Sequence, residues 1–504
     1  MKLNHIYKSI ACGVLLAMTA TSCDLDYNPV DTYSDVTEGV NKTDEKPIFN
    51  SVQDVETSMV TLHKKFRDQQ EHWYVDKLLI GDAHSDNAYA GTTGAEVVPY
   101  ETNSIEGSNS VLKRDWDRFL GDIAVANRII VGCDQLKALS ESERGKYQSQ
   151  AKIFRAMVMF DMVRLWGNFP VITTVGGDIT EDNVEEMYPT YFPPQNTAEE
   201  AYAQIEKDLT EAVENPNTPT NDTSDKSILT KSVARAMLAK VYAEKPLRDY
   251  AKVIKYADEL AADGFDLVED FSDLWAYDTE KKDCRVRNTK EAILEAHFPP
   301  GSGNWCTWMF GRNLSNWDES FTWAKWITPI RLYEEQGDTK RYNESVVWYD
   351  CGWSNYYPAD HYAFMYKCRS AFNSIIYLRY ADILLLKAEA KIMGEAPDLN
   401  GAADIIDRIR NRAGLGKLPQ STRSSKEALL QAYMDERRME LAFEGQRWYD
   451  LCRLNKVEEV MNAVYAKDSG RHAQENLFNE NSYLLAIPQG AIDQNENLIQ
   501  NPGY

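Results

Sequence analysis

The stretch Asp435–Arg453, DERRMELAFEGQRWYDLCR, constrains the fold most, because it mixes many charges with large apolar residues within a few helical turns. Wound as a helix at about 100° per residue, it places Arg437 and Glu444 on its apolar face. That face consists of Leu430, Tyr433, Met434, Leu441, Trp448 and Leu451. Buried charges need partners, and Arg437 with Glu440 and Glu444 with Arg447 have the i,i+3 spacing at which side chains meet. The stretch therefore predicts a helix whose paired charges brace its neighbours.

The same carboxylates allow an enzymatic alternative. Glu436, Glu440 and Glu444 could act as acid and base in glycoside hydrolysis, which uses paired carboxylates. An arginine within reach of each one would keep it ionised, and this favours the structural role. The sequence contains no GxSxG, HExxH or Walker A pattern. We therefore expect no enzyme, with a glycoside hydrolase as the less favoured alternative.

The first residues form the pattern of a secretion signal. Two lysines precede the apolar run Ile10–Ala20, which is too short to span a bilayer, and two small residues come before Cys23. A Cys at this position resembles the bacterial lipoprotein processing site, which implies removal of residues 1–22 and acylation of Cys23. Each buried CH₂ of an acyl chain contributes ~0.8 kcal/mol, so several chains would anchor the protein. Asp24 and Asp26 resemble the surface-export signal of Bacteroidetes lipoproteins.

Charge and length limit the ligands and the domain organisation. The chain has 55 basic and 78 acidic residues, and loss of two lysines with the signal leaves a net charge of −25. Such an acidic protein is a poor partner for nucleic acid or sulfated glycans. Residues 23–50, with the lipidated Cys and two prolines, predict a tether. Residues 51–504 exceed the size of one simple core, roughly 300 residues, and we expect several packed sub-units or an extended helical array.

Local signals predict several helices. Three S/T-x-x-E capping boxes mark helix starts, at Ser140 with Glu143, Thr197 with Glu200, and Ser424 with Glu427. They predict helices over 141–166, 198–213 and 425–443. Apolar residues at helical spacing predict two more, over 52–66 and 111–139.

Two regions have the pattern of antiparallel helix pairs. Residues 232–244 pair with 248–262 before Gly264, and residues 377–393 pair with 402–413 before Gly414. Alanines mark the expected close faces, namely Ala234, Ala236, Ala239, Ala388 and Ala390. Short strands are expected over 170–175 and 292–298. The sequence therefore predicts tetratricopeptide-like helix pairs and no large sheet.

Six cysteines remain in the mature chain: Cys133, Cys284, Cys306, Cys351, Cys368 and Cys452. No pair has CxxC spacing, which disfavours a metal cluster. Disulfides remain open in an exported protein, but we favour isolated thiols.

Residues 301–360, which we name the aromatic excursion, hold seven of the twelve tryptophans between scattered glycines. Pyranose rings have apolar CH faces that stack on aromatic rings, while polar side chains bond their hydroxyls. The predicted ligand contacts are Trp305, Trp308, Trp317, Trp323, Trp326, Trp353 and Tyr356, with Arg312 and Asn316. The alternative for each single tryptophan is core packing. We expect at least one of them to be a stacking platform.

Four stretches together resemble the SusD/RagB family of Bacteroidetes outer-membrane nutrient-capture lipoproteins. They are FRAMVMFDMVRLWGNFPVIT (154–173), YLRYADILLLKAEAKIMG (377–394), the stretch 435–453, and IPQGAIDQNENLIQNPGY (487–504). The last departs from the family at Glu496, where Pro is common. These motifs and the lipoprotein start occur in family order along the whole chain.

The resemblance implies that residues 51–504 form a single all-α domain of about four tetratricopeptide-like helix pairs, with irregular excursions that carry the ligand site. It also implies a partner, a TonB-dependent outer-membrane transporter of the SusC/RagA type, and no cofactor. Family members often use loops after the first helix, which adds Trp73, Asp86, Asn87 and Tyr89 as candidate contacts. The alternative for the loop Asp and Asn side chains is turn capping.

We expect a cell-surface glycan-binding lipoprotein that hands oligo- or polysaccharide to this transporter. Peptide capture, as in the RagB branch, is the main alternative, and a helical scaffold for other proteins is another. The residues do not specify the glycan, its linkage, or whether a bound Ca²⁺ assists.

Overall fold

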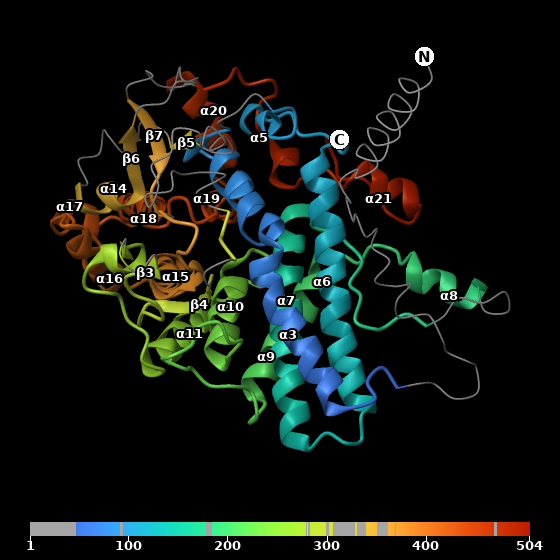
Figure 1. The fold of residues 1–504 in the computed structure, drawn as a ribbon. Helices are drawn as coiled ribbons and strands as arrows, with labels where there is room; N and C mark the ends of the chain where they lie inside the picture. Colours follow the sequence, from blue (N-terminus) through green and yellow to red (C-terminus); the bar gives the residue numbers. More distant parts are fainter. Residues whose placement is uncertain are drawn as a thin grey trace, which may run out of the picture. The chain divides into compact units, whose positions relative to one another are not determined.

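The computed structural model (Figure 1) describes residues 47–90, 94–177, 184–278, 280, 283–298, 302–305, 328–329, 339–349, 361–367, 369–467 and 471–504. All of them belong to one compact unit, Lys46–Tyr504. The predicted signal peptide, Cys23 and the tether up to residue 46 lie outside the described residues.

The compact unit includes the last residues of the predicted tether. Phe49 is buried, and its ring lies so close to Gly132 that a Cβ there would be 2.4 Å away. The Ile48 amide donates to Gln135 Oε1 at 3.1 Å. Residues 48 and 49 therefore pack on α6 (Ser110–Gln135), and the folded part begins before residue 51.

The first long helices lie where the local signals predict them. They are α3 (Val52–Asp68), α6, α7 (Glu141–Trp166) and α9 (Ala198–Glu214). The capping boxes at Ser140 and Thr197 are confirmed. Each of these side chains accepts from the N3 amide, and the side chain of the N3 glutamate accepts from the backbone amide of the N-cap residue. These bonds satisfy amides that have no partner within the helix.

Both predicted helix pairs are present. The first consists of α10 (Lys231–Ala243) and α11 (Tyr250–Ala262), and the second of α15 (Tyr380–Met393) and α16 (Leu399–Ala413). Gly264 and Gly414 have φ of +93° and +85°, the left-handed conformation that ends a helix. All five alanines predicted on the close faces are buried.

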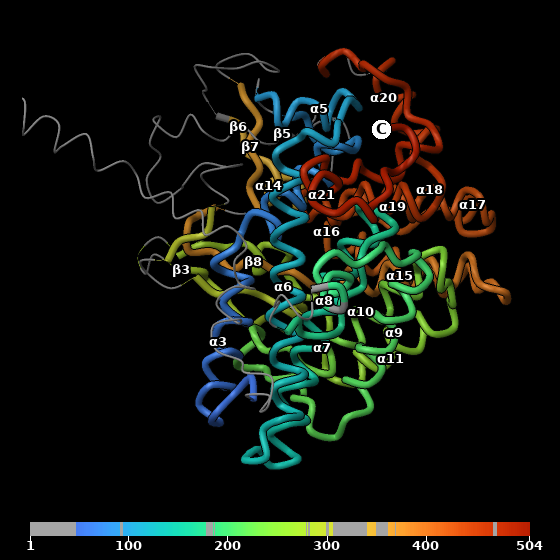
Figure 2. The backbone as a smooth tube through the Cα atoms, turned by 90° about the vertical axis from the view of Figure 1, so that its right-hand side faces the viewer, coloured from blue at the N-terminus to red at the C-terminus, as the bar shows by residue number. Residues whose placement is uncertain are grey.

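Successive helices pack on one another: α6 on α7, α7 on α9, α9 on α10, α10 on α11, α11 on α15 and α15 on α16. Figure 2 follows this order from α6 through α10 to α15. The last long helix, α18 (Lys426–Glu440), packs on α15 and α16. The fold is therefore all-α in class, a tetratricopeptide-like array, as predicted.

Shorter helical elements connect these helices. They are η1 (Glu71–Val75), α4 (Asp76–Leu78), η2 (Leu79–Ala83), α5 (Val98–Thr102), α8 (Val184–Tyr191), η3 (Phe271–Leu274), α14 (Thr339–Ser345), α17 (Gln420–Arg423), α19 (Arg447–Arg453), α20 (Val457–Lys467), η4 (Glu480–Tyr483) and α21 (Gln489–Gln494). Both η1 and η2 are π-helical, so residues 71–83 form a wide, irregular helical segment.

The strands form two-stranded antiparallel pairs. These are β1 (Ala88–Tyr89) with β5 (Thr328–Pro329), β2 (Tyr277–Asp278) with β3 (Asp283–Cys284), β4 (Ala292–Ala296) with β8 (Ile375–Arg379), and β6 (Val346–Tyr349) with β7 (Tyr362–Met365). The strand predicted at 292–298 is β4. The strand predicted at 170–175 is wrong, since only Phe169 forms a bridge there, with Asn196. Residues 377–379 belong to β8 and not to the helix predicted from 377.

The stretch Asp435–Arg453 is not one helix, contrary to the prediction. Between α18 and α19 the chain turns through Phe443 and Gly445, with φ of +60° and +70°. A side chain at Gly81 of η2 would lie 2.3 Å from the Gly445 backbone. The two backbones therefore touch directly, which requires glycine on both sides.

The predicted capping box at Ser424 is also wrong. Ser424 follows α17, and Ser425 caps α18 by accepting from the Ala428 amide at 3.2 Å. Of the two adjacent serines only Ser424 has a glutamate three residues later, but it lies at the end of the short helix α17, and Ser425 is the cap of α18.

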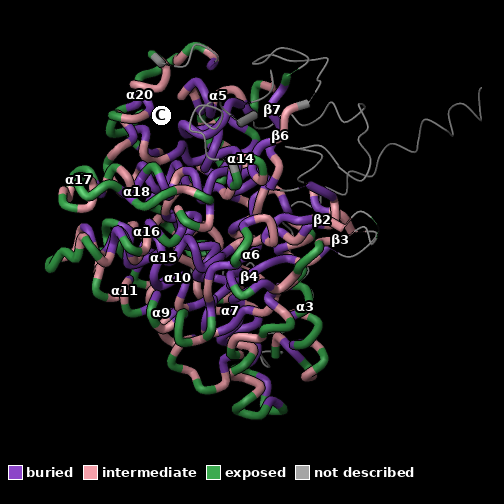
Figure 3. The backbone as a smooth tube through the Cα atoms, turned by 90° about the vertical axis from the view of Figure 1, so that its left-hand side faces the viewer, coloured by how far each residue is buried: buried purple, intermediate pink, exposed green. Residues whose placement is uncertain are grey.

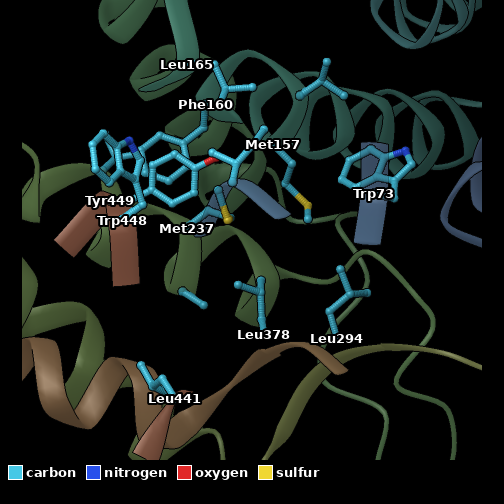
Figure 4. Close-up of a cluster of buried hydrophobic side chains, with 14 of the residues drawn as sticks. Trp73, Met157, Phe160, Leu165, Met237, Leu294, Leu378, Leu441, Trp448 and Tyr449 are labelled. Atoms are coloured by element: carbon cyan, nitrogen blue, oxygen red, sulfur yellow. The ribbon is translucent and has the colours of Figure 1, made fainter. Parts of the chain in front are cut away.

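The core runs through the array. In Figure 3 the buried segments gather on the inner helices, whereas α17 has no buried residue. Figure 4 shows Trp73, Met157, Met237, Leu378 and Tyr449 pointing toward one region from different elements. Between them lies a cavity of about 60 Å³, large enough for a few water molecules.

The described cysteines, Cys133, Cys284 and Cys452, are free thiols. Cys306, Cys351 and Cys368 fall outside the described ranges. Within those ranges no helix has the length and apolar character needed to cross a bilayer.

Candidate functional site

The described residues include five of the predicted ligand contacts: Trp73, Asp86, Asn87, Tyr89 and Trp305. The others, Trp308, Arg312, Asn316, Trp317, Trp323, Trp326, Trp353 and Tyr356, lie outside them. The site is therefore built from the flanks of the aromatic excursion and from the segment that supports it.

Trp73 is a core residue. Its side chain has no exposed surface, and its Nε1 donates to Asp122 at 2.9 Å. Its ring packs between Phe66, at a centroid distance of 4.5 Å, and Phe154, at 5.3 Å. The Trp73 ring thus has no face exposed to solvent.

Asp86 belongs to a buried ion network. Arg447 Nε donates to it at 2.7 Å, and Arg438 Nη1 lies 3.1 Å away. Burial alone would raise the pKa of the Asp86 carboxyl, but these two guanidinium groups outweigh burial and hold it well below its usual range. The carboxylate is thus ionised and already bonded within the scaffold.

Asn87 and Tyr89 are buried beside it. Asn87 donates to Asp82 at 2.9 Å and accepts from Arg438 at 2.9 Å. Tyr89 lies in β1, opposite Thr328 of the excursion. The segment after η2 therefore supports the excursion, and we do not carry Trp73, Asp86, Asn87 or Tyr89 forward as direct ligand contacts.

Trp305 is half-buried on a rigid backbone. Its amide donates to Gln70 Oε1 at 2.8 Å, just after α3. The neighbouring Asn304 amide donates to the Ala371 carbonyl at 2.7 Å, and its side chain donates to the carbonyl of Asn373 at 2.7 Å. The start of the excursion is thereby fixed both to α3 and to the turn that precedes β8.

The β6–β7 pair carries a second aromatic position. Trp348 is half-buried and stacks on His361, with ring centroids 4.1 Å apart and planes 6° apart. Its Nε1 donates to the Tyr342 hydroxyl. Sequence analysis counted Trp348 among the seven tryptophans but did not select it, and the available signal was its place in the β-branched run VVWY.

The charged stretch binds residues at both ends of the β6–β7 pair. Arg341 of α14, directly before β6, donates to Glu436 at 2.7 Å and to Glu440 at 2.9 Å. Lys367, two residues after β7, donates to Glu444 at 2.5 Å. Burial lowers the pKa of Lys367 to about 8, although Glu444 acts in the opposite direction. Both ends of the β6–β7 strand pair are thus bound to the region of α18 and α19.

The charge pairing differs from the predicted i,i+3 pattern. Glu440 bonds to Arg341, Arg379 and Arg412 instead of Arg437. Burial alone would raise the pKa of Glu440, but these three guanidinium groups hold it well below its usual range. A carboxylate held in this way is a poor general acid.

Glu444 and Arg447 also take other partners than the predicted ones. Glu444 accepts from Arg379 at 2.6 Å, and Arg447 donates to Asp86. The described segments contain no group of three or more His, Cys, Asp or Glu side chains suited to a metal ion. The arrangement is thus a support for aromatic side chains.

Comparison with known proteins places these features in a family. A family model described as "SusD family" matches residues 360–504, and one described as "Starch-binding associating with outer membrane" matches residues 32–243. SusD-like protein P2 of Formosa agariphila is 26% identical over 472 residues, covering 85% of this chain and 87% of that protein.

Solved structures share the fold. Surface glycan-binding protein A from Bacteroides fluxus superposes with a TM-score of 0.71 at 20% identity, over 90% of this chain and 100% of that one. Surface glycan-binding protein A from Bacteroides thetaiotaomicron, in complex with laminarihexaose, gives a TM-score of 0.68 at 18% identity, over 89% and 99%. Two family models of this group match separate segments of the chain, residues 32–243 and 360–504, and SusD-like relatives span most of its length, which supports assignment to the SusD/RagB family.

Proposed function

We propose that this protein is a cell-surface lipoprotein that binds oligo- or polysaccharide and hands it to a TonB-dependent transporter of the SusC type. The observation that carries the proposal is the pair of half-buried tryptophans, Trp305 and Trp348, held on rigid supports at the flanks of the tryptophan-rich excursion. Rings fixed in this way bind sugar faces at little entropic cost. A family relative in complex with laminarihexaose supports the same ligand class.

The proposal includes the anchor and the absence of catalysis. Cys23 carries the lipid, and the acidic residues after it direct the protein to the surface of the outer membrane. The family description "associating with outer membrane" supports this location. The three carboxylates considered for hydrolysis, Glu436, Glu440 and Glu444, are paired with arginines, which supports binding without hydrolysis.

Affinity electrophoresis tests the ligand class. The soluble form from Asp24 onward is run through gels that contain laminarin, starch, galactomannan or arabinoxylan. At least one polysaccharide should retard it, and alanine at Trp305, Trp308, Trp317, Trp323 or Trp348 should reduce that retardation. Retardation by none of the gels, or by variants and wild type alike, counts against the proposal.

Two further measurements separate the alternatives. Peptides that co-purify with the protein from native membranes, identified by mass spectrometry, would favour peptide capture. New reducing ends after incubation with a retarding polysaccharide would reveal a hydrolase. Isolation of the tagged protein from outer membranes should bring a TonB-dependent barrel with it, and its absence would refute the handover.

A further inference from the structure

A large open groove lies apart from the described flanks of the aromatic excursion. It encloses about 870 Å³ between residues 103–108, residues 475–482 and the tail 489–504, and we name it the C-terminal groove. Figures 1 and 2 both place the last residue beside α5, whereas β6 and β7 lie on the other side of α5. All residues that line the groove are described.

Backbone and amide bonds fix the walls of the groove. The Glu475 amide donates to the Thr102 carbonyl at 2.9 Å. Asn103 and Asn476 form a reciprocal pair, in which each side-chain amide donates to the backbone carbonyl of the other residue, at 3.1 and 3.0 Å. A groove with walls fixed in this way needs little ordering when a ligand binds.

Tyr504 presents an anchored ring to this groove. Its hydroxyl donates to the Leu484 carbonyl at 3.0 Å, while 43% of the residue stays exposed. The chain reaches this position through Gly503, with φ of +98°, where a Cβ would lie 2.8 Å from Asn481. Leu477, which is 69% exposed, adds an apolar surface to the same groove.

The remaining lining is polar and mostly neutral. Side-chain amides and hydroxyls dominate it, from Asn103, Ser108, Asn476, Asn479, Asn481 and Gln489. Two carboxylates, of Glu106 and Glu475, also line it, and none of its lining residues carries a positive charge. Polyanions are therefore disfavoured, whereas sugar hydroxyls find both donors and acceptors. The anchored ring supplies the flat apolar face that a pyranose needs.

We propose that the C-terminal groove binds a segment of neutral polysaccharide, as a second contact separate from the aromatic excursion. The proposal rests on the glycan class proposed above. Two contacts on one chain raise the avidity for a long polymer, because binding at one site raises the effective concentration at the other.

The experiment compares two exposed tyrosines. Tyr504→Ala and the control Tyr188→Ala, at a residue 42% exposed on α8, are run in the laminarin, starch, galactomannan and arabinoxylan gels. Tyr504→Ala should weaken binding of a retarding polysaccharide roughly fivefold, the loss expected for one aromatic contact. Tyr188→Ala should match the wild type. Leu477→Ser provides a second groove variant at a side chain too exposed to affect folding, and it should weaken binding in the same gels.

The outcomes separate the two proposals. If no gel retards the wild type, both the proposed glycan binding and the second contact in the groove are wrong. If a gel retards the wild type and both groove variants equally, only the second contact is overturned. The aromatic excursion then remains the one proposed glycan site. Equal losses in Tyr504→Ala and Tyr188→Ala would likewise overturn the groove as a specific contact.

Discussion

Arg437 lies between two buried carboxylates, Asp382 at 2.6 Å and Asp450 at 2.7 Å. Sequence spacing predicted Glu440 as its partner. Helical spacing identifies only partners within the same helix, whereas a buried guanidinium binds carboxylates that tertiary packing brings to it, here from α15 and α19. The need for a partner was predictable, but the identity of the partner was not.

Replacing Arg437 by alanine should destabilise the protein strongly. Loss of one member of a buried ion network typically costs ~3–5 kcal/mol, because the remaining charges stay buried. Urea unfolding measures the effect, and glycan affinity of the folded fraction should remain nearly unchanged. Arg408→Ala is the control, since Arg408 is half-exposed and pairs with a half-exposed Asp266, which predicts a loss below ~1 kcal/mol. Equal losses would contradict the buried network.

His84 should make stability depend on pH. It is buried and its Nδ1 lies 2.5 Å from the Tyr100 carbonyl, and burial lowers its pKa from 6.5 to about 4. A lowered histidine pKa means that the unfolded chain binds the proton first. The stabilisation is therefore complete above pH 6.5 and is lost as the pH falls toward 4.

Unfolding free energies at pH 7 and pH 5 test this expectation. Between these values the contribution of His84 should fall by about 2 kcal/mol. His84→Gln should remove that part of the pH dependence. Asp82, with its pKa raised by burial to about 6, acts in the opposite direction in both proteins, so the difference between them isolates His84. An unchanged pH profile in the variant would contradict the buried neutral histidine.

At the level of elements, α18 links three parts of the chain through three successive side chains. Glu436 binds Arg341 of α14, Arg437 binds Asp382 of α15, and Arg438 binds the segment after η2. Neighbouring side chains on a helix point in different directions, about 100° apart. One helix thus supports the excursion, the helix array and the irregular segment 71–90 together.

Arg341→Met should loosen the excursion alone. Glu436 keeps Arg410, and Glu440 keeps Arg379 and Arg412, so neither of these two carboxylates loses all of its partners. Hydrogen exchange should therefore rise in α14, β6 and β7 and stay unchanged in α10 and α11. A uniform rise across all helices would show that the arginine supports the whole array instead.

The start of α18 gives a local test. Ser425→Ala should cost about 1 kcal/mol, the usual value for a lost N-cap. Ser424→Ala should cost less, because its hydroxyl donates only to the Gln420 carbonyl of the short α17. Thermal unfolding of both variants decides which serine caps the helix, and a larger loss at Ser424 would restore the predicted capping box.

At the scale of the whole molecule, the helix ends were predictable from the sequence, because local signals determine them. Caps at Ser140 and Thr197 and left-handed glycines after α11 and α16 fix helix ends through contacts within a few residues. The strand pairs join residues far apart, such as Tyr89 with Thr328, and carry no local signal. The burial of Asp86 and Asn87 carries no local signal for the same reason, since it depends on arginines more than 300 positions away.

Lipid attachment should decide where the whole protein resides. Cys23→Ala should remove the acylation site and shift the protein from the membrane fraction to the soluble fraction. Fractionation with immunoblotting measures this, and Cys133→Ala serves as a control at a buried cysteine. A variant that stays on the membrane would contradict lipid anchoring through Cys23.

The pairing of β4 with β8 has a consequence for how such a protein can diversify. These strands precede and follow the segment 297–374 and lie side by side in antiparallel register, so that segment leaves and re-enters the array at one place. An insertion with adjacent ends can change in length and sequence with little loss of folding free energy in the array, because closing a longer loop costs little additional entropy. Exchange of this segment between relatives should therefore transfer ligand preference while the helical array keeps its fold.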